Sequence, residues 1–151
     1  PVFLRQERMT LDGKTFEIFK FRTMVEEAER DTGPVWASAE DPRRTKVGIW
    51  LRRFNLDEFP QLFNVVRGEM SLVGPRPALP GEAEQYDDWV RNRLRVKPGM
   101  TGLWQVSGRT ETTFSDYIRF DLFYIQNWSL ALDLWIMWRT LRAVFSAEGA
   151  H

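Results

Sequence analysis

The sequence predicts an α+β fold that is mostly helical, with a small N-terminal β-hairpin or sheet packed on amphipathic helices. Two strand-like segments flank an Asp-Gly pair near the start, and apolar residues recur at helical spacing through most of the remaining chain. The composition, 43% apolar and 28% charged, is typical of a globular protein. With 151 residues, the chain is expected to form one domain, residues 1–151.

The N-terminal segment predicts a β-hairpin. Residues 2–4 begin one strand, and residues 16–21, which are rich in phenylalanine, form the other. Asp12 and Gly13 lie between them and provide the residue types that a tight hairpin turn needs. The polar stretch 25–44 follows and predicts a short helix and then a loop.

Two amphipathic helices are predicted next, over residues 45–54 and 57–68. Asp57 stands where the second helix needs an N-cap, and Pro60 falls in its first turn, where proline does least harm. Gly68 is expected to end that helix. The apolar stripes are Val47, Trp50, Leu51 and Phe54 in the first helix, and Phe59, Leu62, Phe63 and Val66 in the second.

The remaining chain predicts a proline-rich loop over 71–81 and a helix over 82–96, with Ala83, Tyr86 and Val90 on one face. A glycine-rich loop with room for one strand follows over 97–111. Two closing helices are expected over 114–127 and 131–145.

The composition excludes several classes of protein. The chain has no cysteine, so a disulfide framework and a thiolate zinc site are excluded, and a reducing compartment fits. The single histidine, His151, argues against a histidine-based catalyst or metal site. The net charge is zero, so the chain lacks the basic field of a typical nucleic-acid binder. It has no apolar run of about 18 residues that would span a bilayer.

Asp57 and Glu58 form an adjacent pair of acids in an apolar frame. Two neighbouring carboxylates could hold Mg²⁺, with water and substrate phosphates completing its coordination. One of them could instead attack phosphorus and form an acyl phosphate. The plainer alternative is a helix N-cap followed by an acidic first turn, which is a common arrangement.

Arg76 stands between Pro75 and Pro77, which restrict the backbone on both sides of it. A guanidinium held in this way suits bidentate phosphate binding, although an arginine in a surface turn would look the same in sequence. Further basic residues are scattered along the chain. If several converge on the acidic pair, the site has the charge pattern of phosphoryl transfer; if they do not, they form a solvated face. They are Lys20, Arg22, Arg43, Arg44, Arg52, Arg53, Lys97 and Arg109.

The last predicted helix carries Trp and Leu on one face, with Arg139 and Arg142 outside it. Tryptophan and arginine on an amphipathic helix suit a membrane interface, and a core-packing helix is the alternative. The seven Trp and eleven Phe of the chain fit either a rich core or a surface that meets something apolar.

Taken together, these segments resemble the bacterial sugar transferase family, the monotopic phosphoglycosyl transferases that act on polyprenyl phosphate. The similarity covers nearly the whole chain, and its combination of motifs is highly specific. The matching segments are RQERMTLDGKTFEIFKFRTM, DPRRTKVGIWLRRFNLDEFPQLFNVVRGEMSLVGPRP, KPGMTGLWQVSGR and DLFYIQNWSLALDLWIM.

The resemblance implies a reaction in two steps. Asp57 would attack the β-phosphate of a UDP-sugar and release UMP, and a polyprenyl phosphate, typically undecaprenyl phosphate, would then take the sugar-phosphate. Glu58, with Asp57 close by, would bind Mg²⁺. Arg76 would bind the nucleotide or its phosphate. The resemblance also places Lys20 and Arg52 at phosphates, and it places Arg22, Lys97, Gln105 and Arg109 near the site.

The resemblance further implies a protein on the cytoplasmic face of the bacterial inner membrane, with its helices on the membrane surface. It would make the first lipid-linked intermediate of an exopolysaccharide or glycoconjugate. Family members carry an apolar re-entrant segment before the point where this chain begins, so we expect the chain to be a catalytic portion of a longer protein. The sugar that is transferred stays open, and so does assembly into a homo-oligomer.

Three other interpretations remain. A non-catalytic scaffold could dock on membranes through the aromatic helices, and it would show no Mg²⁺-dependent nucleotide binding. A nucleic-acid binder would use the arginine-rich stretches, against which the zero net charge and the paired acids argue. A Mg²⁺-dependent phosphohydrolase would share the acidic pair and differ only in using water as the acceptor.

Overall fold

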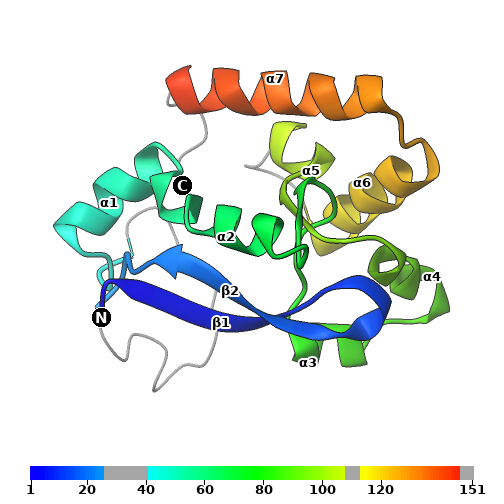
Figure 1. Cartoon of the computed structure of the whole chain (residues 1–151), viewed down its shortest axis with the longest axis horizontal. Helices are drawn as coiled ribbons and strands as arrows, with labels where there is room; N and C mark the ends of the chain where they lie inside the picture. Colours follow the sequence, from blue (N-terminus) through cyan, green and yellow to red (C-terminus); the bar gives the residue numbers. More distant parts are fainter. Residues whose placement is uncertain (26–40, 108–112, 147–151) are drawn as a thin grey trace.

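The computed structural model describes residues 1–25, 41–107 and 113–146. Its α+β architecture confirms the predicted fold class: the described residues form two small two-stranded sheets and several helices. In Figure 1 the N-terminal hairpin and the last helix lie at opposite edges of the molecule, with a short helix between them. The predicted helix and loop over 25–44 fall largely outside the described residues.

The N-terminal hairpin is confirmed. β1 (Phe3–Met9) pairs antiparallel with β2 (Thr15–Phe21), so that Phe3 lies opposite Phe21 and Met9 opposite Thr15. The turn, η1 (Leu11–Gly13), holds Asp12 at φ 58° and Gly13 at φ 72°. Both values are left-handed, and Asp and Gly tolerate that conformation better than most residues do.

The first predicted amphipathic helix is confirmed as α1 (Lys46–Arg53), which begins at Thr45; the Thr45 hydroxyl accepts a hydrogen bond from the amide of Gly48. The second prediction is wrong in detail, because Asp57 is not an N-cap. Asp57 lies inside a separate 3₁₀ turn, η2 (Leu56–Glu58), and α2 (Gln61–Val66) begins only after Pro60.

The chain divides there for two local reasons. Asn55 takes a left-handed φ of 53°, which interrupts the helical path before η2. Pro60 has no amide hydrogen, so it cannot continue the hydrogen bonds of the turn that precedes it. Gly68, at φ 77°, lies just beyond the end of α2, as the sequence predicts.

The predicted helix over 82–96 is also wrong, because three short helices replace it: α3 (Pro80–Glu84), α4 (Asp88–Arg91) and η3 (Asn92–Arg95). Asp87 accepts a hydrogen bond from the amide of Val90 and starts a new helix in mid-segment. The three residues expected to share a face still pack in one cluster, with Ala78, Leu94 and Met9. They are Ala83, Tyr86 and Val90.

A second, parallel sheet joins β3 (Ser71–Val73) to β4 (Gly99–Thr101). The strand predicted in the glycine-rich segment is confirmed as β4. The loop predicted over 71–81 is wrong at its start, where the structure has β3. The two strands meet where glycines pass closely: a Cβ on Gly99 would lie 2.0 Å from the amide nitrogen of Gly74. No larger residue fits at Gly99, and the crossing holds the segment after Gly74 in place.

The two closing helices are confirmed as α6 (Phe114–Gln126) and α7 (Leu130–Ser146), with α5 (Leu103–Val106) before them. Val73, Leu103, Tyr124 and Ile136 form the cluster in which α5, α6 and α7 pack on β3. Within the described ranges, no helix combines the length and the apolar character needed to cross a bilayer.

Substituting Gly48 tests the packing of α1. We expect Gly48→Ala to lower the free energy of unfolding by about 2 kcal/mol, because its Cβ would lie 2.0 Å from the Thr23 carbonyl oxygen. Urea denaturation followed by circular dichroism measures the change. Gly81→Ala in α3 is the control: its Cβ meets nothing within 4 Å, so it should be neutral or slightly stabilising. Equal stability of the two variants would contradict the close packing of α1.

Candidate functional site

The η2 turn presents the acidic pair in two different environments. Asp57 is buried, with 9% of its surface exposed, whereas Glu58 is partly accessible. The carboxylate of Glu58 accepts a hydrogen bond from the ammonium of Lys20 at 3.0 Å, and both side chains are about a quarter exposed. Lys20 of β2 is therefore in direct contact with the acidic pair.

Asn64 of α2 explains why β2 lies beside this turn. Its side chain is fully buried and accepts a hydrogen bond from the Phe19 amide while donating to the Glu17 carbonyl oxygen. A second contact joins its amide nitrogen to the Glu69 carboxylate. Asn64 thus acts as an additional partner for the edge of β2 and fixes Lys20 opposite Glu58.

Burial raises the pKa of the Asp57 carboxyl above its ordinary value, and the negative charge of Glu58 raises it further. The cations of Lys20 and Arg52 act in the opposite direction. Arg52 is itself half-buried and donates a hydrogen bond from Nε to the hydroxyl of Thr23. A carboxylate of this kind is more basic than a solvated one, which suits a nucleophile.

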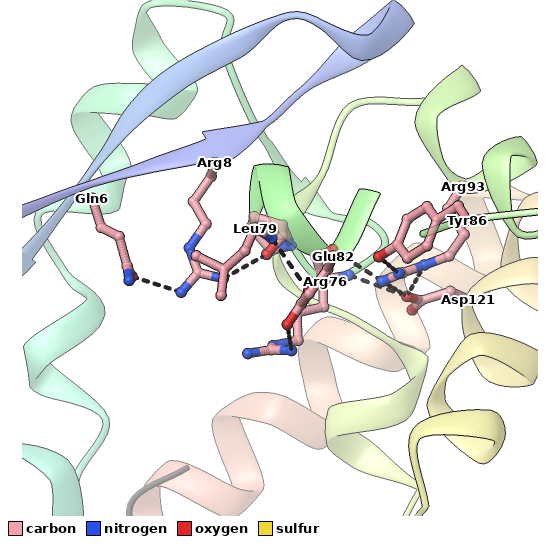
Figure 2. Close-up of polar contacts among 9 residues, drawn as sticks. Gln6, Arg8, Arg76, Leu79, Glu82, Tyr86, Arg93 and Asp121 are labelled. Carbon is pink, nitrogen blue, oxygen red and sulfur yellow. Dashed lines mark hydrogen bonds and ion pairs between the residues drawn. The ribbon is translucent and has the colours of Figure 1, made fainter. Parts of the chain in front are cut away.

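The Arg76 backbone is held by a buried ion pair. The guanidinium of Arg93 donates to the Asp121 carboxylate from Nη2 at 2.6 Å and from Nε at 3.0 Å, and both side chains are almost completely buried. The same Nη2 donates to the Arg76 carbonyl oxygen at 3.1 Å. The Arg76 amide approaches the Asp121 carboxylate at 3.4 Å. Figure 2 shows this pair grouped on one side of Arg76.

The opposite side of the same loop is held by β1. Arg8 donates a hydrogen bond to the Pro77 carbonyl oxygen at 3.0 Å and another to Gln6 (Figure 2). The Arg76 guanidinium lies over the ring of Tyr117, 5.8 Å from its centroid, and 3.9 Å from the Glu82 carboxylate. The structure therefore fixes both the backbone and the side chain of Arg76.

These elements surround a cleft of about 200 Å³. Three basic side chains and one carboxylate line it. The cleft therefore suits an anionic ligand that binds to the basic side chains and lies next to the carboxylate. The buried side-chain nitrogen of Gln61 has no hydrogen-bond partner among the described residues, and nor does the buried side-chain oxygen of Gln105. The cleft is lined by Arg8, Ile18, Lys20, Glu58, Gln61, Arg76, Pro77, Gly99, Met100, Trp104 and Gln105.

The structure brings together Lys20, Glu58, Arg76 and Gln105 of the residues that the sequence singles out. Asp57 precedes Glu58 in the same turn but does not line the cleft, and Arg52 acts on Asp57 electrostatically. Other candidates lie elsewhere. Arg22 donates to the Pro1 carbonyl oxygen at the hairpin end, the Lys97 ammonium lies near Gly68, and Arg109 is outside the described residues.

Arg8, Gln61 and Trp104 also line the cleft, although the sequence did not single them out. The hairpin register contains a signal for Arg8: it lies opposite Phe16, so it shares a strand face with Ile18 and Lys20. Gln61 had no such signal, because its position at the start of α2 depends on the break at Pro60. Trp104 looked like one aromatic residue among many.

The acidic pair limits how a metal could bind. Among the described residues, no group of three or more His, Asp or Glu side chains could hold a metal ion. Mg²⁺ often takes only one or two protein carboxylates, with water and substrate phosphates as its other ligands. Of the pair, Glu58 lines the cleft and could bind Mg²⁺ that arrives with a phosphate substrate, whereas Asp57 does not line it.

Comparison with known proteins points to one family. Residues 1–147 match the family model described as bacterial sugar transferase. The exopolysaccharide production protein ExoY of Sinorhizobium fredii is 43% identical over 99% of this chain and 73% of its own length. The UDP-galactose-lipid carrier transferase of Erwinia amylovora is 47% identical, over 96% of this chain and 33% of its own length. The UDP-glucose:undecaprenyl-phosphate glucose-1-phosphate transferase of Klebsiella pneumoniae is 43% identical, over 100% and 34%.

The electrostatic coupling within the acidic pair predicts a pH effect. Because the charge of Glu58 raises the pKa of Asp57, Glu58→Gln should lower that pKa and extend the ionised range of Asp57 towards acid pH. Carboxyl ¹³C chemical shifts of the labelled protein, followed against pH, measure the change. Asp12→Asn is the control, because Asp12 lies in the hairpin turn, far along the strand from Lys20. An Asp57 pKa that Glu58→Gln raises or leaves unchanged would refute the coupling.

Proposed function

This chain belongs to the bacterial sugar transferase family, and we propose that it moves a sugar-1-phosphate from a UDP-sugar to a polyprenyl phosphate through a covalent aspartyl intermediate. The observation that carries the proposal is the convergence of Lys20, Glu58 and Arg76 on one cleft, beside the buried carboxylate of Asp57. Undecaprenyl phosphate and UDP-sugars appear in the names of the relatives, and we extend them to this chain on that ground.

In the first step, a carboxylate oxygen of Asp57 attacks the β-phosphorus of the UDP-sugar. The bond between that phosphorus and the bridging oxygen breaks, and its electron pair leaves with UMP. Because Asp57 is buried and does not line the cleft, this attack requires its side chain to rotate towards the bound diphosphate. Lys20 and Arg76 neutralise the charge that develops on the phosphate oxygens and the leaving group.

In the second step, an oxygen of polyprenyl phosphate attacks the same phosphorus. The bond to Asp57 breaks and its electron pair returns to the carboxylate, so the enzyme is regenerated. Transfer prevails over hydrolysis if the acyl phosphate is shielded from water until the lipid arrives, and a cleft that lies against the membrane surface would provide that shielding. A phosphohydrolase would need this position open to water.

We propose Mg²⁺ as the cofactor, held by Glu58 with Asp57 nearby. When bound, Mg²⁺ would supply charge neutralisation for the diphosphate of the donor. The ion pair between Lys20 and Glu58 keeps the Glu58 carboxylate turned to the cleft, where it can receive a phosphate-bound cation.

We also propose that the protein lies on the cytoplasmic face of a bacterial inner membrane, where nucleotide sugars are made. The apolar stripes of α1 and α2, which the sequence predicts, are on the surface: Trp50 is 56% exposed and Phe63 is 66% exposed. The last helix adds Trp138 and Phe145, with Arg139 and Arg142 beside them. Apolar side chains flanked by arginine suit an anionic lipid surface.

Replacing the proposed nucleophile tests the reaction. We expect Asp57→Asn to abolish both UMP release and the gain in protein mass that one sugar-phosphate would cause, because an amide is a poor nucleophile. Intact-mass spectrometry after mixing the protein with Mg²⁺ and a panel of UDP-sugars measures both and identifies the donor. Asp12→Asn should behave as the unchanged protein. An adduct on Asp57→Asn would refute the assignment.

Replacing aromatic residues of α7 tests the membrane surface. Trp138→Gln together with Phe145→Gln should weaken binding to phosphatidylglycerol vesicles by about tenfold or more, because buried aromatic area is lost. Vesicle co-sedimentation measures the partition. Trp89→Gln is the matched control, since Trp89 is exposed on α4, away from these helices. Equal losses in both proteins, or none in either, would contradict a specific membrane-binding surface.

A further inference from the structure

A second, smaller cleft of about 40 Å³ adjoins the first at Glu58. It lies between α7 and the turn that follows α1, because Asn55 and Thr140 both line it. The two clefts have Glu58, Met100 and Gln105 in common. The complete lining of the second is Asn55, Glu58, Met100, Thr101, Gln105, Val106, Thr140, Ala143 and Val144.

The two clefts differ in chemistry. The first contains Arg8, Lys20 and Arg76, whereas Glu58 is the only charged side chain among the described residues that line the second. The two hydroxyl groups in the second cleft are already used: those of Thr101 and Thr140 are 2.7 Å apart, and Thr140 also donates to the Ile136 carbonyl oxygen. Of the other lining residues, Asn55 and Gln105 carry amides, and the apolar part of the wall is formed by Met100, Val106, Ala143 and Val144. This apolar part favours a hydrocarbon chain over a nucleotide.

The second cleft also lies at the surface that we assign to the membrane. Ala143 and Val144 belong to the same turn of α7 as Leu141 and Phe145, which are 53% and 84% exposed. On the other wall, Asn55 follows directly on α1, whose Trp50 and Ile49 are exposed. A lipid leaving the bilayer between these helices would therefore reach Glu58 through the second cleft.

The geometry of phosphoryl transfer links the clefts. The attacking and leaving oxygens lie roughly in line through phosphorus. After Asp57 has displaced UMP, the acceptor must attack from the side opposite Asp57, so its oxygen enters where UMP left. The UDP-sugar and the lipid phosphate therefore use one phosphate position. The nucleoside of the first and the hydrocarbon chain of the second must extend from that position in different directions.

We propose that the second cleft is part of the acceptor subsite: Met100, Val106 and Ala143 contact the first carbon atoms of the polyprenyl chain at the open mouth of the cleft, while the phosphate takes the position vacated by UMP beside Glu58. This inference rests on the proposed function. It assigns the cationic cleft to the UDP-sugar and the second cleft to the lipid, with Glu58 common to both.

Filling the second cleft separates the two steps of the reaction. Ala143→Phe should leave sugar-phosphate adduct formation and UMP release within about twofold of the unchanged protein, because Ala143 does not line the cleft assigned to the UDP-sugar. It should raise the KM for geranyl phosphate, a short isoprenyl phosphate, by about tenfold or more. This probe tests the subsite itself, because it dissolves in water and needs no docking to a membrane.

Ala131→Phe is the matched control, because Ala131 is an exposed alanine on the same helix, outside both clefts. It should leave both steps unchanged. If Ala143→Phe fails to fold, Ala143→Leu adds less volume at the same place and should raise the same KM in the same direction. UMP should also compete with geranyl phosphate, because the two share the phosphate position.

Two results would overturn the inference. An unchanged KM for geranyl phosphate in a folded Ala143 variant would mean that the acceptor lies elsewhere. Loss of adduct formation in that variant would mean that the second cleft belongs to the donor. Absence of any adduct on the unsubstituted protein is a different outcome, since it would refute the proposed covalent function itself.

Discussion

The buried ion pair between Arg93 and Asp121 is the interaction on which the rest of the site depends. It joins η3 to α6, and through Arg76 it reaches the loop that follows β3. Removing one partner of such a pair typically costs about 3–5 kcal/mol, because the other charge is left buried. Tyr86 supports the pair by accepting a hydrogen bond from Arg93. Arg76 thus reaches the cleft from a backbone that is fixed from within the protein, which is an arrangement suited to positioning a phosphate.

The ionisation of Asp57 in the acidic pair depends on opposing electrostatic effects. Asp57 is buried beside a second carboxylate, and both effects disfavour its charge; Lys20 and Arg52 offset them only in part. A carboxylate of this type would be a reactive nucleophile because it is poorly solvated, and the nearby cations favour its ionised form. Asn64 keeps this balance in place by joining α2 to the strand that carries Lys20.

The sequence predicts those parts of the fold that local chemistry determines. Asp12 and Gly13 mark the hairpin, and apolar spacing marks the two closing helices. The helices predicted over 57–68 and 82–96 fail because Asn55, Pro60 and Asp87 interrupt the regular spacing. The burial of Arg93 could not be predicted from the neighbouring sequence, because its partner Asp121 lies 28 residues away. A charged residue in a helical segment normally faces solvent. Lys20, Glu58 and Arg76 line one cleft although they lie far apart in the sequence, and the roles that the resemblance implies for them stay predictions.

We propose that the sugar-phosphate passes through a covalent bond to Asp57 before the lipid accepts it. Exchange of labelled UMP into unlabelled UDP-sugar, measured with Mg²⁺ and without any acceptor, tests this most directly. A covalent intermediate predicts that label enters the UDP-sugar, because the first step is reversible and needs no lipid. Transfer to added polyprenyl phosphate without any such exchange would contradict the account, since it would mean that the lipid attacks the UDP-sugar directly.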